Sequence, residues 1–471
     1  MNLPDLAKAK VRTSNKVSII KDDYQIPDSV KEIGKGKKFY LKTYGCQMNV
    51  HDSENIKGML NDLKYTETDV MDEADLIILN TCAIRENAHN KVFGFLGRVK
   101  HLKEYKPNII VGLCGCMAQE ENVVNILKKY TFVNIVFGTH NLHKLPELLA
   151  SSIEKNAQEI EIYSIEGNVY ENIPVKRDSK YKAWVNIQFG CDKFCTYCIV
   201  PYTRGKQRSR MPEDILNEVK ELVNDGYLEV TLLGQNVNAY GKDLDMNYTM
   251  ADLLRDVALT GIKRVRFVTS HPWDFSDDMI DVIAKYDNIM PYIHLPLQSG
   301  SNRILKLMGR RYTKEEYLEL FNKLKTKIPN CAITTDIIVA FPGETLEDFK
   351  DTLDVVNKCQ YDSAFTFIYS PREGTPAAKM ENKLSEDEKN RRLYELNEVV
   401  NKYALENNLK YKGKTVPVLI EGIGEKDTLF GYTDTMKLVN VDGDTDNIGK
   451  IVDVEIIDVK TWSLDGIIKK S

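Results

Sequence analysis

Short hydrophobic runs alternate with longer amphipathic segments through residues 37–155. Runs such as residues 76–79 (LIIL) are apolar at every position, which is typical of strands buried on both faces of a parallel sheet. The segments between the runs repeat their apolar positions at helical spacing. We therefore predict an N-terminal α/β domain built on a parallel sheet, with strands over 38–44, 75–80, 108–113 and 133–137 and helices over 52–63, 84–104, 118–129 and 143–155.

The alternation resumes at residue 181 and continues to residue 410. Six β/α units predict a partial (β/α)6 barrel, in which functional residues follow the C-terminal ends of the strands. A long charged segment over 385–410 predicts a helix that ends this domain. The predicted barrel strands are 183–188, 229–233, 264–268, 292–297, 334–339 and 364–369.

The remaining segments lack this alternation. Residues 1–36 are charged and aperiodic, which predicts a flexible extension, and residues 156–180 are polar and irregular, which predicts a linker. Residues 411–471 contain short β-rich runs separated by glycine turns, which predicts a small β-barrel. The predicted fold class is therefore α/β, with a parallel-sheet domain, a partial barrel and a C-terminal β-barrel in succession.

Composition narrows the possible functions. The net charge of −5 excludes a uniformly basic nucleic-acid binder, so any RNA contact must come from a local patch. No apolar run reaches the roughly 18 residues of a membrane helix, and residues 1–16 contain no signal-type segment, so we expect a cytoplasmic protein without membrane association. Nine cysteines in such a protein favour reduced metal ligands over disulfides.

Three of these cysteines, Cys191, Cys195 and Cys198, form a CxxxCxxC run directly after the first barrel strand. Three thiolates can hold a four-iron cluster that normally takes four, which leaves one iron open to another ligand. An open position is typical of a catalytic metal site, whereas a structural zinc site would lack a fourth ligand nearby. The run resembles that of the radical SAM superfamily, which implies a [4Fe-4S] cluster that binds S-adenosylmethionine (SAM) and places Tyr197 near its adenine.

Polar or glycine-rich loops follow the next barrel strands. Any one of them alone would be explained as a connecting turn, but together at successive strand ends they favour a binding site. The superfamily resemblance implies that SAM lies against these loops. The candidate cofactor contacts are therefore Tyr197, Gln235, Ser270 and Gln298.

Three further cysteines, Cys46, Cys82 and Cys116, follow successive strands of the N-terminal domain. Because the ends of parallel strands converge on one edge of the sheet, these thiols can meet and hold a second cluster with an open iron. Buried structural thiols are the alternative explanation. Cys114 lies two residues before Cys116 and stays a substitute candidate.

Three motifs resemble the methylthiotransferase family, and the similarity covers nearly the whole chain from residue 38 onward. They are residues 45–49 (GCQMN), 80–88 (NTCAIRENA) and 197–210 (YCIVPYTRGKQRSR). The resemblance implies that Cys46, Cys82 and Cys116 hold an auxiliary cluster, which brings the cofactors to two [4Fe-4S] clusters and SAM.

The same motifs favour the branch of the family that modifies tRNA. This implies a tRNA substrate carrying isopentenyl-adenosine, in which a methylthio group is added to C2 of N6-(dimethylallyl)adenosine next to the anticodon. One SAM would methylate a sulfur bound at the auxiliary cluster, and another would give the 5′-deoxyadenosyl radical that an unactivated C2–H bond requires. The alternatives are a methylthiotransferase acting on threonylcarbamoyl-adenosine tRNA or on a ribosomal protein, or a non-catalytic RNA-binding or iron–sulfur carrier protein.

Several segments are candidates for contact with partners. Residues 411–471 resemble a TRAM domain, which implies RNA binding, although acidic residues outnumber basic ones there. We expect phosphate contacts from the basic run that follows the cysteine loop. An electron donor such as a flavodoxin or ferredoxin, and iron–sulfur assembly or sulfur-donor proteins, are the further expected partners. The basic candidates are Arg204, Lys206, Arg208 and Arg210, followed by the weaker pairs Arg264 and Arg266, Arg310 and Arg311, and Arg391 and Arg392.

Overall fold

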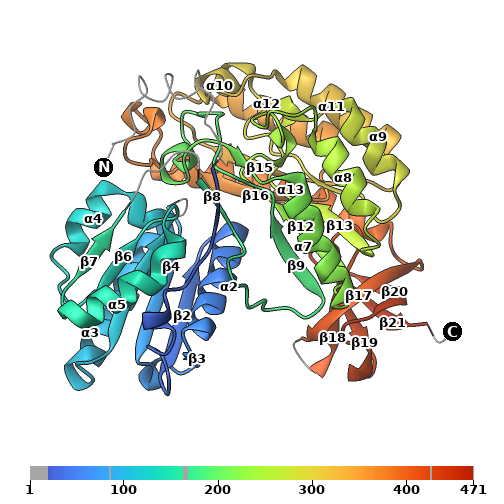
Figure 1. Cartoon of the computed structure of the whole chain (residues 1–471). Helices are drawn as coiled ribbons and strands as arrows, with labels where there is room; N and C mark the ends of the chain where they lie inside the picture. Colours follow the sequence, from blue (N-terminus) through green and yellow to red (C-terminus); the bar gives the residue numbers. More distant parts are fainter. Residues whose placement is uncertain (1–19, 84–85, 163–167, 425–426, 470–471) are drawn as a thin grey trace.

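The computed structural model describes residues 20–83, 86–162, 168–424 and 427–469. Figure 1 shows an N-terminal α/β domain in blue and cyan, a larger green-to-yellow domain beside it, and a small red barrel at the C-terminal end. The predicted fold class is confirmed, with the parallel sheet, the partial barrel and the small β-barrel following one another along the chain.

The N-terminal domain contains a six-stranded parallel sheet in the order β3-β2-β4-β5-β6-β7. Neighbouring residues of the central strand β4 (Leu76–Thr81) point to opposite faces of the sheet. Ile77 belongs to the hydrophobic core on one face, and Ile78 belongs to the core on the other. Both faces therefore need a helical cover, which explains why this strand is apolar throughout. The strands are β2 (Lys38–Tyr44), β3 (Thr66–Glu67), β4 (Leu76–Thr81), β5 (Ile110–Gly115), β6 (Ile135–Phe137) and β7 (Glu159–Glu161), and the helices are α2 (Gln47–Asp62), α3 (Glu86–Tyr105), α4 (Glu121–Leu127) and α5 (Leu145–Lys155).

The second domain consists of two three-stranded parallel sheets, β13-β12-β9 and β14-β15-β16. A bridge between Val265 and Ile289 joins them into the predicted six-stranded partial barrel. One large hydrophobic core lies between the strands and the helices outside them. The strands are β9 (Lys182–Asn186), β12 (Glu229–Leu233), β13 (Arg264–Phe267), β14 (Tyr292–His294), β15 (Ala332–Val339) and β16 (Ser363–Ile368), and the helices are α7 (Pro212–Asn224), α8 (Met250–Ala258), α9 (Asp277–Lys285), α10 (Asn302–Leu307), α11 (Lys314–Lys327), α12 (Leu346–Cys359) and α13 (Glu386–Leu409).

The C-terminal domain is a closed barrel in the order β17-β18-β19-β21-β20. Arg264 attaches it to the partial barrel by donating hydrogen bonds to the carbonyl oxygens of Tyr432 at 2.9 Å and Pro417 at 3.0 Å. The RNA contact predicted for Arg264 is therefore wrong, because its guanidinium is buried in a domain junction. The strands are β17 (Thr415–Ile423), β18 (Leu429–Thr433), β19 (Leu438–Asp442), β20 (Ile451–Val459) and β21 (Leu464–Ile468).

The segments predicted to be irregular differ most from the structure. β1 (Ile20–Asp23), within the predicted flexible extension, pairs in parallel with β8 (Asn168–Glu171), within the predicted linker. The linker also supplies the edge strand β7. These strands are three or four residues long and polar, so no hydrophobic period marks them. The first 19 residues of the predicted extension lie outside the described residues.

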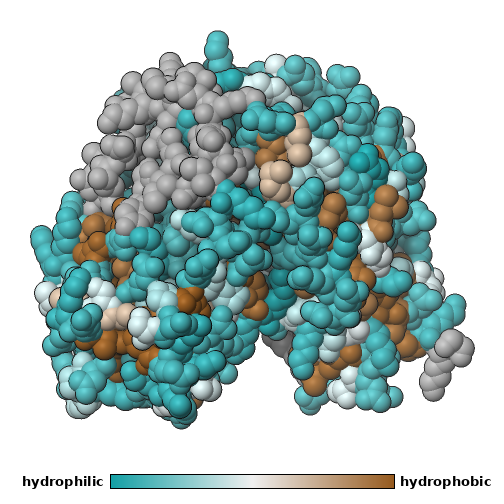
Figure 2. Space-filling view, viewed as in Figure 1, coloured by the Kyte–Doolittle hydropathy of each residue, from teal (hydrophilic) through white to brown (hydrophobic). Residues whose placement is uncertain are grey.

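The face seen in Figure 2 is mostly hydrophilic, with hydrophobic side chains in small separate patches and a recess between the N-terminal domain and the C-terminal barrel. Among the described residues, no helix combines the length and the apolar character needed to cross a bilayer.

Candidate functional site

The cysteine loop of the partial barrel runs between β10 (Gln188–Phe189) and α6 (Val200–Thr203). Gly190 begins it with a φ of +72°, and a Cβ there would lie 1.9 Å from the carbonyl oxygen of Lys206. Only glycine fits this position, because the loop must both turn and pass against the backbone. The amide of Cys198 then donates to the carbonyl of Cys195 at 3.0 Å, which folds the end of the loop back on itself.

The structure brings the three thiols of this loop close together, since Cys195 and Cys198 both act on Cys191, and Cys195 also acts on Cys198. Burial raises the pKa of Cys198 to about 12, and the neighbouring Cys195 thiol adds to the shift. Burial likewise raises the pKa of Cys191. Three thiolates held this close need positive charge beside them, and the irons of a cluster would supply it. The donor set therefore fits a [4Fe-4S] cluster.

Strained backbone surrounds the mouth of the partial barrel. Phe194 in the cysteine loop has a φ of +45°, and Thr269, Gln298 and Ala340 have φ angles of +68°, +70° and +57° after β13, β14 and β15. Non-glycine residues rarely adopt this left-handed region, and such strain concentrates at functional sites. The loops at successive strand ends are thus held in unusual conformations rather than being simple turns.

Two of the candidate SAM contacts carry buried polar atoms that no described group satisfies. Both amide atoms of Gln235 and the hydroxyl of Ser270 lack a hydrogen-bond partner, as do both amide atoms of Asn238. The Val237 amide donates to the Thr269 carbonyl at 3.2 Å and so joins the two loops. Buried polar atoms normally have partners, so these indicate a polar ligand between the loops and fit SAM.

The other two candidates occupy different surroundings. Gln298 is 8% exposed, and its backbone extends β14 by donating to Asp336 at 2.8 Å and accepting from Ile338 at 2.9 Å. Tyr197 packs edge-on against Phe341, with 6.4 Å between ring centroids. These rings form an aromatic wall that suits a flat base such as adenine.

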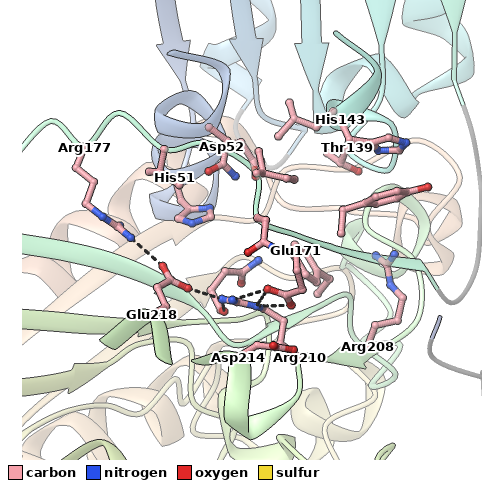
Figure 3. A pocket seen from close by; sticks show the side chains of 18 of the residues that line it. His51, Asp52, Thr139, His143, Glu171, Arg177, Arg208, Arg210, Asp214 and Glu218 are labelled. Atoms are coloured by element: carbon pink, nitrogen blue, oxygen red, sulfur yellow. Dashed lines mark hydrogen bonds and ion pairs between the residues drawn. The ribbon is translucent and has the colours of Figure 1, made fainter. Parts of the chain in front are cut away.

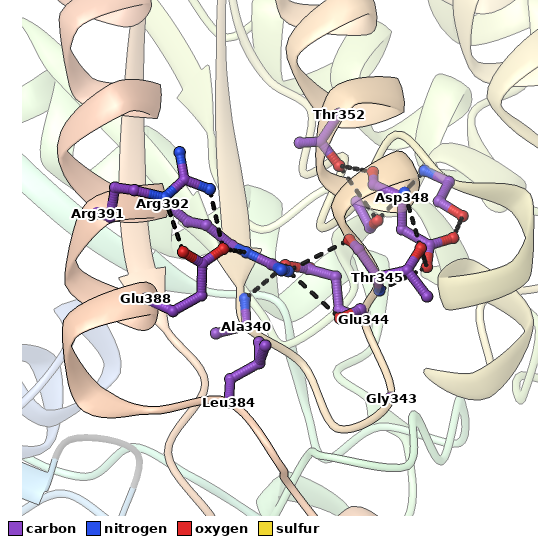
Figure 4. A network of polar contacts seen from close by, with 12 residues as sticks. Ala340, Gly343, Glu344, Thr345, Asp348, Thr352, Leu384, Glu388, Arg391 and Arg392 are labelled. Carbon is purple, nitrogen blue, oxygen red and sulfur yellow. Dashed lines mark hydrogen bonds and ion pairs between the residues drawn. The ribbon is translucent and has the colours of Figure 1, made fainter.

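Phe341 belongs to a loop that a buried ion pair holds in place (Figure 4). Glu344 accepts from the Ala340 amide at 2.9 Å and from the Arg392 guanidinium at 2.7 Å, and both charged side chains are at most 3% exposed. Arg392 comes from α13. The expected RNA contact at Arg392 is therefore wrong, because this arginine fixes a loop of the barrel mouth.

Two further residues belong to the site although the sequence does not indicate this. Arg310 was considered for RNA, but it is 8% exposed and donates from Nη1 to the Cys195 sulfur at 3.5 Å. Asp274, 9% exposed, accepts from Lys193 at 2.7 Å and from Lys242 at 2.6 Å. In the sequence, Arg310 is one of two adjacent arginines and Asp274 is an isolated acidic residue. Neither pattern indicates a place in the functional site.

The second cysteine set lies at the C-terminal edge of the N-terminal sheet. Cys46 is the N-cap of α2, Cys82 follows β4, and Cys116 begins the 3-10 helix η3 (Cys116–Gln119) after β5. A hydrogen bond with Cys82, aided by the charge of Arg204, lowers the pKa of Cys46 to about 6. The structure thus brings these distant cysteines together, as the convergence of parallel strands requires.

Backbone geometry distinguishes Cys116 from Cys114. Cys114 lies within β5 and packs in the core with Ile78 and Phe137. Gly115 then turns the chain with a φ of +93°, where a Cβ would lie 2.3 Å from the Thr81 carbonyl oxygen. The turn directs Cys116 out of the core and toward the other two thiols, which fits Cys116 rather than Cys114 as the third ligand.

The two cysteine sets adjoin each other. Cys116 and Ala83 pack with Ile199 and Tyr202, which directly follow the barrel cysteines. No group of three His, Cys, Asp or Glu side chains in the described parts of the chain surrounds a single metal ion. A four-iron cubane binds each thiolate to a different iron, so its ligands stand farther apart than those of one ion.

The basic run after the cysteine loop is internal, so the predicted phosphate contacts are wrong. Arg204, Lys206 and Arg208 are 5 to 6% exposed. Arg210 is also largely buried, and it pairs with Glu171 and with Glu218 at 2.7 Å each. Two members of the motif, Arg204 and Arg210, neutralise acidic groups between the domains.

This run lines a cavity of about 460 Å³ between the N-terminal domain, the segment around β8 and the partial barrel. Figure 3 shows Arg177, Glu218, Arg210 and Glu171 linked in a chain along it, while His51 projects from α2. None of the described cysteines is among its lining residues. The cavity is a polar domain junction, and its lining includes Asp52 and Arg204.

Of the weaker arginine pairs, Arg266 is buried beside Glu229 at 3.7 Å, and the exposed Arg391 pairs with Glu388 and Glu395 at 2.7 Å each. Arg311 is different. It is exposed, and its described contact is with the ring of Trp273, 5.0 Å away.

Family profiles match all three domains. The profile of the uncharacterized protein family UPF0004 matches residues 38–138, that of the radical SAM superfamily matches residues 185–356, and that of the TRAM domain matches residues 409–469.

Whole proteins and solved structures are also similar. A tRNA-2-methylthio-N(6)-dimethylallyladenosine synthase of Staphylococcus haemolyticus is 54% identical over 99% of this chain and 91% of the relative. The Bacillus subtilis protein of the same name is 54% identical over 98% of this chain and 92% of its own length. The radical S-adenosylmethionine methyltransferase TsrM of Kitasatospora setae has the same fold, with a TM-score of 0.52 and 14% identity over 73% of this chain and 75% of that one.

The similarity to these relatives extends over nearly the full length of both chains. This chain belongs to the family of tRNA-2-methylthio-N6-dimethylallyladenosine synthases, the MiaB branch of the radical SAM methylthiotransferases.

Proposed function

We propose that this protein adds a methylthio group to C2 of N6-(dimethylallyl)adenosine at position 37 of tRNA, next to the anticodon. The observation that carries the proposal is the packing of Cys116 against Ile199, which places the two cysteine sets side by side. A base between them could meet a radical source on one side and a sulfur source on the other. The relatives are named tRNA-2-methylthio-N(6)-dimethylallyladenosine synthase, and this name supports the same substrate.

In this proposal the chain holds two [4Fe-4S] clusters, one on Cys191, Cys195 and Cys198 and the other on Cys46, Cys82 and Cys116. When bound, SAM at the barrel cluster supplies a radical able to remove hydrogen from an unactivated carbon and a methyl group for sulfur, and the auxiliary cluster supplies the sulfur.

The chain's own task is binding and orientation. Gln235 and Ser270 would offer their unpartnered polar atoms to SAM, Tyr197 would lie near its adenine, and Gln298 would line the same site. The Glu344–Arg392 pair keeps the loop of Phe341 closed against this site. No side chain is required as a general acid or base, because hydrogen-atom removal needs no proton transfer.

The rim of the barrel mouth supports an RNA substrate. Trp273 is 45% exposed, and its ring is flanked by the ammonium of Lys193 at 4.4 Å and the guanidinium of Arg311 at 5.0 Å. Aromatic and arginine planes stack on unpaired bases, and cations contact phosphate. This rim suits an anticodon loop that delivers one base to the mouth, with the TRAM barrel as a second RNA contact. The reaction also needs an electron donor, such as a flavodoxin or ferredoxin, and proteins that supply iron–sulfur units or sulfur.

Nucleoside mass spectrometry tests the proposal directly. Isopentenylated tRNA is incubated without oxygen with the reconstituted protein, SAM and a strong reductant. A methylthio gain on the isopentenyl-adenosine is expected, and it should be lost in Cys191→Ala and in Cys82→Ala separately. If tRNA stays unmodified while 5′-deoxyadenosine forms, the substrate assignment fails, and threonylcarbamoyl-adenosine tRNA and ribosomal protein become the substrates to test.

A further inference from the structure

Arg204 lies between the two cysteine sets. Its backbone amide closes α6 by donating to Val200 at 2.8 Å, so a single helical turn links it to Cys198. Its Nη2 donates to the Asp52 carboxylate at 2.6 Å. Asp52 belongs to α2, the helix that begins directly after Cys46. The ion pair therefore joins the element after the barrel cysteines to the element after the first auxiliary cysteine.

The pair is buried, with side chains 6% and 11% exposed for Arg204 and Asp52. Removing two charges from water is costly, and stability alone would favour hydrophobic residues at such a place. The guanidinium also has more donors than Asp52 accepts. α6, which ends at Arg204, packs against η3, which begins with Cys116, and the guanidinium charge favours the thiolate forms of Cys46 and Cys116. The surroundings of the guanidinium are thus a carboxylate on one side and auxiliary thiols on the other.

A cluster on three thiolates carries negative charge in a buried site. Hydrogen bonds to its sulfurs and nearby positive charge both favour the reduced form, because reduction adds an electron to the cluster. Arg204 is placed to provide the positive charge. Asp52 fixes the guanidinium plane, which a lysine ammonium, a single point charge, cannot reproduce.

We propose that Arg204, anchored by Asp52, is a positioning residue for the auxiliary cluster: its positive charge raises the reduction potential of the cluster, and the ion pair holds the auxiliary site against the barrel cysteine loop. The inference rests on the proposed function, because it assumes a cluster on Cys46, Cys82 and Cys116.

The test is a redox titration of the auxiliary cluster, followed by electron paramagnetic resonance, in full-length protein whose barrel cysteines are all alanine. Arg204→Gln should make the potential more negative, and Arg204→Lys should shift it less. Asp52→Asn, which keeps the guanidinium but weakens its anchor, should also lower it. Arg255→Gln, on the surface of α8, is the matched control and should not change it.

In protein with both clusters, Arg204→Gln should lower methylthiolation at least tenfold while 5′-deoxyadenosine formation from SAM continues. Equal potentials in all variants with the cluster loaded would overturn the inference. If the Arg204→Gln protein does not retain the cluster, the reduction potentials of the Asp52→Asn and Arg204→Lys proteins are compared with that of the unsubstituted protein. Unchanged potentials in those two variants would likewise overturn the inference. An alanine-background protein that binds no cluster at all would instead refute the proposed auxiliary site. No tRNA enters the titration, so a wrong substrate assignment leaves its result intact.

Discussion

Asn49 and Asn80 form a reciprocal buried pair: Asn49 Nδ2 donates to Asn80 Oδ1 at 3.1 Å, and Asn80 Nδ2 donates to the Asn49 carbonyl at 2.8 Å. Asn49 lies three residues after Cys46, and Asn80 two residues before Cys82. Both side chains are fully buried. The pair therefore sets the spacing between the two cysteine loops.

We expect Asn80→Ala to leave Asn49 with unsatisfied buried groups, at a cost of about 1–3 kcal/mol. The cysteine loops should separate, so iron bound at the auxiliary site and methylthiolation should fall together while SAM cleavage continues. Iron analysis and product assays measure this. Asn61→Ala, at an exposed position of α2, is the control. Equal loss of both activities would contradict the assignment.

Gly190→Ala should disable the barrel site selectively. Its Cβ would collide with the Lys206 carbonyl oxygen, which belongs to the backbone and cannot rotate away. We expect 5′-deoxyadenosine formation to drop at least tenfold. The control is Gly226→Ala, whose φ of +85° is similar but whose Cβ meets nothing within 4 Å. That variant should lose about 1 kcal/mol of stability and keep its activity. Similar losses in both would show that backbone strain, not the close approach, matters.

Arg392→Ala should be strongly destabilising. Glu344 would be left buried without its cation, which typically costs 3–5 kcal/mol. Urea unfolding measures the loss, and weaker SAM binding should accompany it because the loop of Phe341 is released. Its neighbour Arg391 pairs with acidic residues on the exposed face of α13. Arg391→Ala should therefore change stability by less than about 1 kcal/mol, and a comparable loss there would argue against the buried pair.

His51 should make stability depend on pH. Burial, only partly opposed by the charges of Asp52 and Glu218, lowers its pKa from 6.5 to about 4. The unfolded chain protonates His51 near pH 6.5, whereas the folded protein does so only near pH 4. The contribution of neutral His51 to folding stability is therefore complete above pH 6.5 and is lost as the pH falls to about 4. The loss amounts to roughly 3 kcal/mol. His51→Gln should flatten the change in urea midpoint across this window, and an unchanged slope would show that His51 does not titrate there.

Arg311→Gln should weaken tRNA binding across sequences and reduce the slope of log affinity against log salt by about 1, as expected for one lost phosphate contact. Trp273→Ala should weaken binding by about 1–3 kcal/mol through lost stacking, with little change in the salt slope. Filter binding at several salt concentrations measures both. Arg255→Gln serves as the surface control, and equal slopes for Arg311→Gln and the control would place the RNA elsewhere.

The sequence predicted those features that periodic patterns or short motifs encode. β2 and β12 begin and end where hydrophobic periodicity predicted, and the cysteine sets meet where parallel strands converge. Cys116 could be separated from Cys114 only by the structure, because the turn at Gly115 decides which thiol leaves the core.

Charge was harder to interpret than hydrophobicity. The basic run from Arg204 to Arg210 suggested a surface for RNA, but its acidic partners, such as Asp52 and Glu171, lie far away in sequence. The start of α2 was missed for a related reason. In its first turn, residues 47–51, the polar residues Asn49 and His51 are buried, so the inward-facing positions are not marked by hydrophobic residues.

The pairing of β1 with β8 constrains how the protein is made. Ile20 pairs with Asn168, so β1 is synthesised before the N-terminal α/β domain and finds its partner only after that whole domain has been made. Such a distant contact is slow to form, and it follows the local ones. The strand can thus close over the domain junction only when the segment between the two cysteine sets has emerged. Its pairing would mark the point in synthesis at which the N-terminal domain is committed to its place beside the barrel.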